Sequence, residues 1–138
     1  MIVDATGLVL GRLASVAATH LLAGDEVKIV NAEKAIITGR RESIYEEYFA
    51  SRDRGTKERG PYFPRRPEMI LKRTVRGMLP YKLKRGRDAM SKLRVYIGVP
   101  SDLSGLQFEQ PSAAKVKGAS SANYIELGDL SKRLGAHF

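Results

Sequence analysis

The sequence predicts an α/β fold, and two patterns in its first third indicate this. The short apolar segment 1–5 ends at a turn, Thr6-Gly7. Apolar residues then recur at helical spacing: Leu10, Leu13, Ala14, Ala17, Ala18 and Leu21. Gly24 suits the left-handed end of that helix, and residues 27–30 form a second apolar segment. A strand that returns to another strand through a helix of this length is a right-handed parallel crossover in nearly all known cases. The sequence therefore starts with a strand–helix–strand unit.

Further elements are predicted along the rest of the chain. Residues 35–38 form a brief third strand candidate, and a helix follows over 42–52 with Ile44, Tyr48 and Phe49 facing inward. Pro67 suits the first turn of a helix that carries an apolar side and a basic side and that Pro80 ends.

Residues 82–138 are predicted to hold one more strand and two helices. Residues 82–87 indicate a basic turn, residues 89–93 a short helix, and residues 95–99 a strand apolar enough to lie inside a sheet. Residues 111–123 are typical of a loop or tail, and residues 124–138 have leucines at near-helical spacing. We expect one domain, with a scaffold at 1–53 and 94–100, basic loops and a helix at 54–93, and a C-terminal extension at 101–138.

Length and composition limit the class of protein. A chain of 138 residues makes one domain that buries a substantial core, and 43% of the residues are hydrophobic. No apolar run approaches the roughly 20 residues of a membrane span, and the N-terminus has no basic region before an apolar stretch. The absence of cysteine excludes disulfides and thiolate chemistry and fits a reducing cytosol. We expect a soluble cytoplasmic protein without a membrane partner.

The positive charge is concentrated in residues 54–94. This segment holds 14 basic and 3 acidic residues, a net charge of +11, whereas the whole chain has +9. The remainder is slightly acidic. A concentrated field of one sign attracts polyanions, and a sequence pI near 10 makes nucleic acid the leading partner.

The make-up of the basic segment favours RNA. Arginine outnumbers lysine in it by nine to five, and the guanidinium fork matches phosphate geometry. Tyr62, Phe63 and Tyr81 are suited to stacking on unpaired bases, although Phe63 is equally suited to anchoring the loop to the core. No zinc-finger spacing, zipper or base-reading helix indicates duplex DNA. The predicted RNA-binding residues are Arg54, Lys57, Arg59, Tyr62, Arg65, Arg66, Lys72, Arg73, Arg76, Lys82, Lys84, Arg85 and Arg87.

The sequence lacks the motifs that an enzyme active site would require. Gly7 and Gly11 flank a strand-to-helix turn, but a Walker loop needs four residues between its glycines followed by Lys and Ser or Thr. His20 and His137 have no second ligand or nucleophile at a recognisable spacing, and Glu46-Glu47 point in different directions on a helix. We therefore expect no catalytic residues, metal site, cofactor or small-molecule substrate.

Several spaced motifs resemble those of the ribosomal protein L13 family of the large subunit. They are Asp4-Ala5-Thr6-Gly7 with residues 10–15, Gly24-Asp25, residues 30–34, residues 74–80 and residues 93–98. The similarity covers residues 1 to about 100 in order. The short loop over 60–67 and the tail ending at 126–130 resemble the archaeal and eukaryotic branch of the family.

The resemblance implies a three-layer α/β/α domain on a mainly parallel four-stranded sheet, with a basic loop extension and a C-terminal helix. It implies a non-catalytic constituent of the large ribosomal subunit that binds 23S-type rRNA, contacts neighbouring ribosomal proteins and supports early assembly. Two alternatives remain open at this point. One is a regulator that binds mRNA away from the ribosome, and the other is a nucleotide-hydrolysing or RNA-modifying enzyme that uses the Gly7 turn.

Overall fold

The computed structural model describes residues 1–53, 64–115, 124–136 and 138 as an α/β fold. Its strands are β1 (Ile2–Asp4), β2 (Val27–Val30), β3 (Ile36–Thr38), β4 (Leu93–Val95) and β5 (Tyr124–Glu126). Its α-helices are α1 (Leu10–Leu22), α2 (Arg41–Asp53), α3 (Pro67–Gly77), α4 (Lys84–Ser91) and α5 (Leu127–Leu134). Two 3₁₀ turns, η1 (Ala32–Lys34) and η2 (Ser112–Ala114), complete the elements of the described residues.

The main sheet is parallel, with the strand order β1-β2-β4. Val3 lies opposite Ile29, and Ile29 lies opposite Val95 on its other side. The predicted crossover is confirmed, because α1 connects the two parallel neighbours β1 and β2. The central strand is the most apolar of the three, since Val27, Ile29 and Val30 are fully buried. The helices therefore pack on a sheet whose central strand lies in the core.

The predicted single sheet of four mainly parallel strands is wrong for the described residues. β3 and β5 form a separate antiparallel pair in which Ile37 lies opposite Ile125. A fourth parallel neighbour of β1 exists only as one bridge between Val3 and Glu109. The backbone N–H of Glu109 donates to Ile2 at 2.8 Å, and its carbonyl accepts from Asp4 at 3.0 Å.

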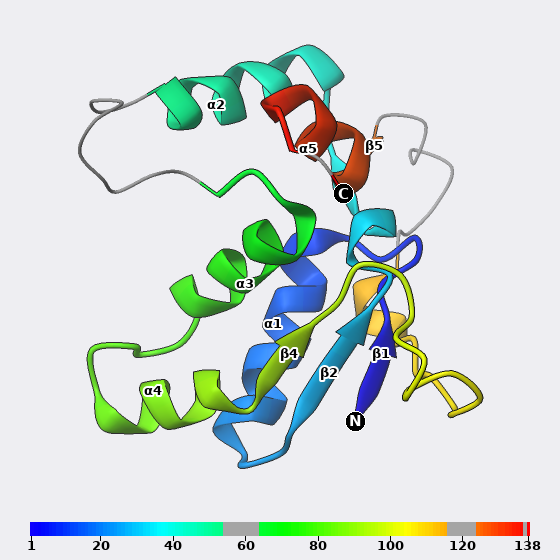
Figure 1. Ribbon diagram of the computed structural model, residues 1–138. Coiled ribbons are helices and arrows are strands. Elements are labelled where there is room, and N and C mark those ends of the chain that lie inside the picture. Colours follow the sequence, from blue (N-terminus) through cyan, green and yellow to red (C-terminus); the bar gives the residue numbers. More distant parts are fainter. Residues whose placement is uncertain (54–63, 116–123, 137) are drawn as a thin grey trace.

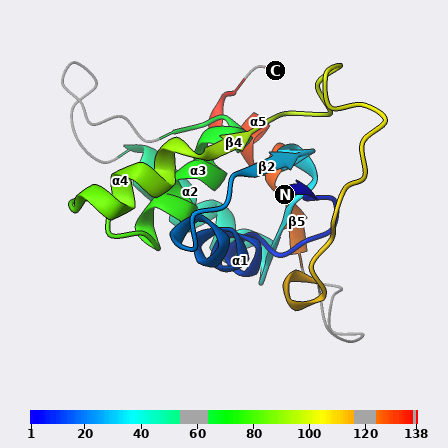
Figure 2. The same cartoon turned by 90° about the horizontal axis from the view of Figure 1, so that it is seen from below.

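The helices divide into two groups. α1, α3 and α4 lie on one side of the parallel sheet (Figure 2), and both α3 and α4 contact α1. α2 and α5 contact each other, and they lie beyond the carboxyl ends of the parallel strands (Figure 1). They therefore do not supply the second helical layer that a three-layer sandwich requires.

Three local predictions need correction. The strand expected over 95–99 is Leu93–Val95, because Gly98 has φ +67° and the chain there turns to meet η1. The basic turn expected over 82–87 is helical from Lys84 onward. The loop expected over 111–123 contains η2, whose Ala114 is fully buried and accepts a hydrogen bond from Val9 at 2.9 Å, while residues 116–123 lie outside the described residues.

One cluster of buried apolar side chains connects these elements. It includes Val3 and Leu13 from the N-terminal unit, Leu71 from α3, and Leu127 and Leu130 from α5. The helix that carries much of the basic charge is therefore fixed to the same core as both ends of the chain.

Candidate nucleic-acid interface

Helix α3 is amphipathic, and its polar side carries basic residues. Pro67 occupies the first turn as predicted, where its missing N–H costs no hydrogen bond. Ile70, Leu71 and Val75 are buried and form the apolar side. Lys72, Arg73 and Arg76 lie on the remaining surface, Arg73 exposed and the other two half-buried. Packing of the apolar side on α1 thus orients three cations outward.

Helix α4 continues this basic surface. Gly86 and Ala89 are its buried residues, and the predicted RNA-binding residues Lys84, Arg85 and Arg87 are exposed. Lys82 is exposed in the turn before the helix. The structure therefore places the described basic residues on two neighbouring helices and the turn that joins them. The outermost described members, Arg65 and Arg66, are exposed just before α3, whereas four predicted RNA-binding residues lie outside the described part: Arg54, Lys57, Arg59 and Tyr62.

The turn between α3 and α4 has a tightly defined backbone. The N–H of Tyr81 donates to the Leu79 carbonyl at 2.8 Å, and the N–H of Leu83 donates to the Pro80 carbonyl at 2.9 Å. The Arg76 guanidinium lies over the Tyr81 ring, 4.3 Å from its centroid. This cation–π contact uses one face of an aromatic ring that the sequence predicts to stack on bases.

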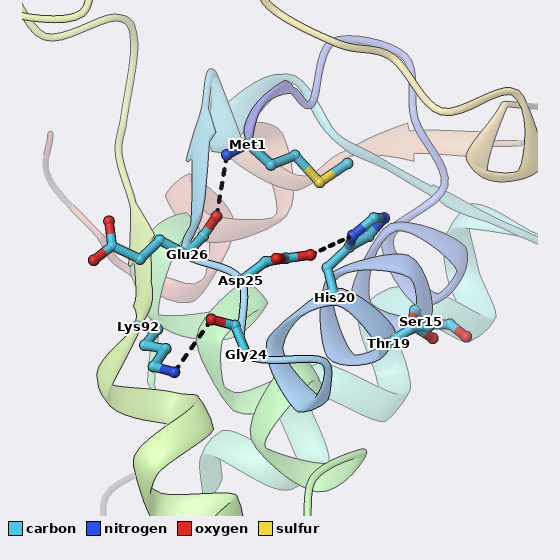
Figure 3. Close-up of polar contacts among 8 residues, drawn as sticks. All are labelled: Met1, Ser15, Thr19, His20, Gly24, Asp25, Glu26 and Lys92. Atoms are coloured by element: carbon cyan, nitrogen blue, oxygen red, sulfur yellow. Dashed lines mark hydrogen bonds and ion pairs between the residues drawn. The ribbon is translucent and has the colours of Figure 1, made fainter.

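Some cations of the basic segment serve the protein's own structure. Lys92 donates to the Gly24 carbonyl at 3.2 Å and so ties the start of β4 to the turn after α1 (Figure 3). Arg94 donates to the carbonyls of Ser91 and Leu93. Arg66 is paired with Glu68 at 2.9 Å, although the Arg66 side chain stays 55% exposed. These residues are less available to an external anion than their charge alone suggests.

Other cations are uncommitted. Within the described ranges, Arg73, Lys84 and Arg85 have no side-chain hydrogen bond or ion-pair partner. They are exposed, so each guanidinium or ammonium group is able to bind a phosphate. We regard the exposed cations of α3, α4 and their joining turn as the centre of the candidate interface.

A cavity of about 230 Å³ lies between α2 and α3 next to this surface. Tyr48 and Ser51 line it from α2, and Ile70, Arg73 and Thr74 line it from α3. Burial, and to a lesser degree the neighbouring Glu47 charge, raises the pKa of the Tyr48 phenol above its ordinary value of 10.0. Tyr48 therefore stays protonated at physiological pH.

The turn after β1 does not offer a phosphate site. The N–H of Gly7 donates to the Lys34 carbonyl, that of Leu8 to Ala5, and that of Val9 to Ala114. Because these amides already have protein acceptors, they cannot cradle a nucleotide phosphate. The geometry therefore supports a tight strand-to-helix turn here and not a nucleotide site.

Asp4 organises the loops at the carboxyl end of the sheet. Its Oδ1 accepts hydrogen bonds from the Thr6 hydroxyl at 2.7 Å, the Thr6 N–H at 3.0 Å and the Asn31 amide at 3.0 Å. Partial burial raises the pKa of Asp4, but these hydrogen bonds and the Lys34 charge outweigh it and lower the pKa below 3.8. The network also holds Asn31 in the left-handed conformation, with φ +56°.

The histidine and acidic side chains form no metal centre in the described residues. No three histidine or acidic side chains gather there to hold a metal ion. His20 lies at the end of α1, with Nδ1 3.3 Å from Asp25 Oδ2 (Figure 3). None of the helices in the described ranges has the length and hydropathy of a membrane span.

Comparison with known proteins identifies the family. The model of the family described as "Ribosomal protein L13" matches residues 1–102. The chain belongs to the ribosomal protein L13 family. The resemblance seen in the motifs is thus confirmed, and L13 family proteins are non-catalytic proteins of the large ribosomal subunit.

Archaeal relatives match nearly all of the chain. A protein of Methanosarcina barkeri is 55% identical over 138 residues, covering 99% of both chains. One from Methanococcoides burtonii is 53% identical with the same coverage, and one from Halobacterium salinarum is 42% identical over 99% of this chain and 92% of its own. Each of the three is named "Large ribosomal subunit protein uL13". The predicted resemblance to the archaeal and eukaryotic branch is confirmed by these archaeal relatives.

One feature of the protein's surface was not predicted from the sequence. Met78 and Leu83 are 43% and 55% exposed, in the middle of the basic surface. The sequence did contain an indication that Leu83 is exposed, because this residue stands between Lys82 and Lys84 and outside any apolar stripe.

Proposed function

We propose that this chain is a structural constituent of the large ribosomal subunit that binds large-subunit rRNA through α3, α4 and their joining turn. One observation carries the proposal: uncommitted, exposed cations gather on two core-anchored helices of an L13 family member. Neighbouring ribosomal proteins are further partners, and support of early subunit assembly is the expected role.

The mechanism is static recognition. Arginines bind phosphates of neighbouring rRNA segments, reduce the repulsion between those segments and hold their junction in the assembled form. Arg73 has no partner within the described part of the chain and keeps its donors for phosphate. Base-specific contacts contribute little in this mechanism, because phosphate contacts position a protein without reading sequence.

The salt dependence of rRNA binding tests the interface. If about seven cations contact phosphate, the slope of log affinity against log salt is about −5 to −6. The Arg73→Ala/Arg85→Ala variant should reduce the size of that slope by about 1.5. Arg40→Ala/Arg41→Ala is the matched control, because it also removes two exposed arginines but near the start of α2. An equal loss in both variants would reject α3 and α4 as the binding surface.

Sedimentation of a cell lysate through sucrose gradients tests the assignment to the subunit. We expect stoichiometric co-sedimentation with large subunits that withstands moderate salt. A mostly free pool would instead favour the alternative of an mRNA-binding regulator.

A further inference from the structure

An apolar tip stands in the middle of the basic surface. It consists of Met78, Tyr81 and Leu83, which are 43%, 38% and 55% exposed and lie within six residues of the chain. The α3–α4 connection that carries them lies at the outer edge of the molecule, away from β3 and β5 (Figure 1). Apart from the Arg76 guanidinium over one face of the Tyr81 ring, these exposed parts face away from the rest of the described chain.

The tip is rigid for a surface connection. Leu79, in its centre, is only 3% exposed and anchors the turn in the core. Gly86 approaches the turn so closely that a Cβ there would clash with the Pro80 carbonyl and stand 2.8 Å from the Tyr81 nitrogen. Together with the Arg76 stack and the two turn hydrogen bonds, these contacts fix the tip before any partner arrives. A backbone that is already fixed loses little conformational entropy on binding.

The charge around the tip selects its partner. Residues 76–88 hold five basic residues and one acidic residue, a net charge of +4. An apolar surface of a neighbouring protein does not explain this ring of cations, whereas RNA combines a dense array of phosphates with apolar base and sugar faces. Apolar side chains that enter between base steps are a known way to bind nucleic acid. The minor groove of an RNA helix is also wide and shallow enough to admit them.

Single exposed leucines are common on protein surfaces and need no explanation. Leu22, at the end of α1, is one, since it is 49% exposed and Ala23 and Gly24 follow it. Leu83 differs because it has two exposed apolar neighbours, a rigid turn and flanking cations. The two leucines therefore make a matched pair for an experiment.

We propose that the apolar tip inserts against an unpaired base or into the minor groove of rRNA, with Leu83 as the leading side chain. Lys82 and Lys84 bind the phosphates on either side of the insertion. This inference rests on the proposed function and adds to it a contact that does not depend on charge.

The experiment compares Leu83→Ala with Leu22→Ala for binding to protein-free large-subunit rRNA over a range of salt concentrations. We expect Leu83→Ala to lower the affinity about five- to tenfold at every salt concentration, because it removes buried apolar area and no charge. The salt slope should stay unchanged, and Leu22→Ala should bind like the unaltered chain. Leu83→Met, which keeps the apolar volume, should restore most of the affinity.

A structural readout accompanies the affinities. Chemical probing of the rRNA bases should show at least one base whose reactivity changes with the unaltered chain but not with Leu83→Ala. Equal affinities for Leu83→Ala and Leu22→Ala would overturn the inference. So would normal rRNA binding by Leu83→Ala combined with poor entry into large subunits, because the tip would then contact a protein. Absence of salt-dependent rRNA binding by the unaltered chain would overturn the proposed function itself.

Discussion

The guanidinium of Arg133 lies over the ring of Tyr45, 4.6 Å from its centroid, and so joins α5 to α2. The Tyr45 ring stacks on Phe49 with centroids 6.0 Å apart, and the Arg52 guanidinium lies over Phe49 at 4.8 Å. Four side chains thus form a continuous stack along α2. Because Arg52 is paired with Asp53, the stack reaches from the C-terminal helix to the residue before the basic segment.

A double-mutant cycle should detect the first contact of this stack. Arg133→Met and Tyr45→Leu keep most of the apolar bulk but remove the cation or the ring. We expect a coupling free energy of about 0.5–1 kcal/mol in urea unfolding, since both groups are only partly shielded from water. Strict additivity of the two single variants would show that the contact adds nothing to stability.

Two glycines in helices should respond in opposite ways to alanine. Gly86→Ala should lower the free energy of unfolding by about 1–3 kcal/mol, because its Cβ meets the Pro80 backbone. Gly11→Ala should raise it by up to about 1 kcal/mol, because nothing lies within 4 Å of the new Cβ and alanine favours the helix. Thermal or urea unfolding measures both. A stable Gly86→Ala variant would contradict the rigid turn.

Asp4 should make stability depend on pH. Its hydrogen bonds lower its pKa below 3.8 in the folded state, so its contribution is fully present above that ordinary value. The contribution is lost as the pH falls through the lowered folded pKa. Asp4→Asn should therefore be less stable than the unaltered chain at pH 7, and the difference should shrink in acid. Urea unfolding at pH 7 and pH 3 would show it, and a difference independent of pH would contradict the assignment.

Local patterns predicted α1 and α3 well, whereas α4 begins earlier than predicted. The leucine and alanine spacing before Gly24 gave α1, and Pro67 with an apolar stripe gave α3, because an amphipathic helix that packs on one core shows its period in the sequence. The strand after α4 was predicted too late in the chain. Gly98 sits among apolar residues that resemble a strand, yet its positive φ turns the backbone toward η1.

Non-local pairing was not predictable from local patterns. Ile37 pairs with Ile125, which lies 88 positions later in the chain, and neither short segment indicates its partner. Similarly, the sequence predicted where the basic surface lies, but not which of its cations form hydrogen bonds within the protein and which have no partner. Lys92 and Arg73 are both basic residues of the same segment. Lys92 donates to the Gly24 carbonyl, whereas Arg73 has no partner among the described residues.

The bridge between Val3 and Glu109 also affects how the free protein presents the edge of its sheet. β1 is an outer strand of the parallel sheet, and an open strand edge is a template for aggregation. The segment around Glu109 occupies the backbone groups of Ile2 and Asp4 at that edge. On the opposite edge, the exposed charge of Arg94 in β4 discourages another strand from docking. The segment around Glu109 thus leaves fewer free backbone groups at the β1 edge for a second copy of the chain to pair with.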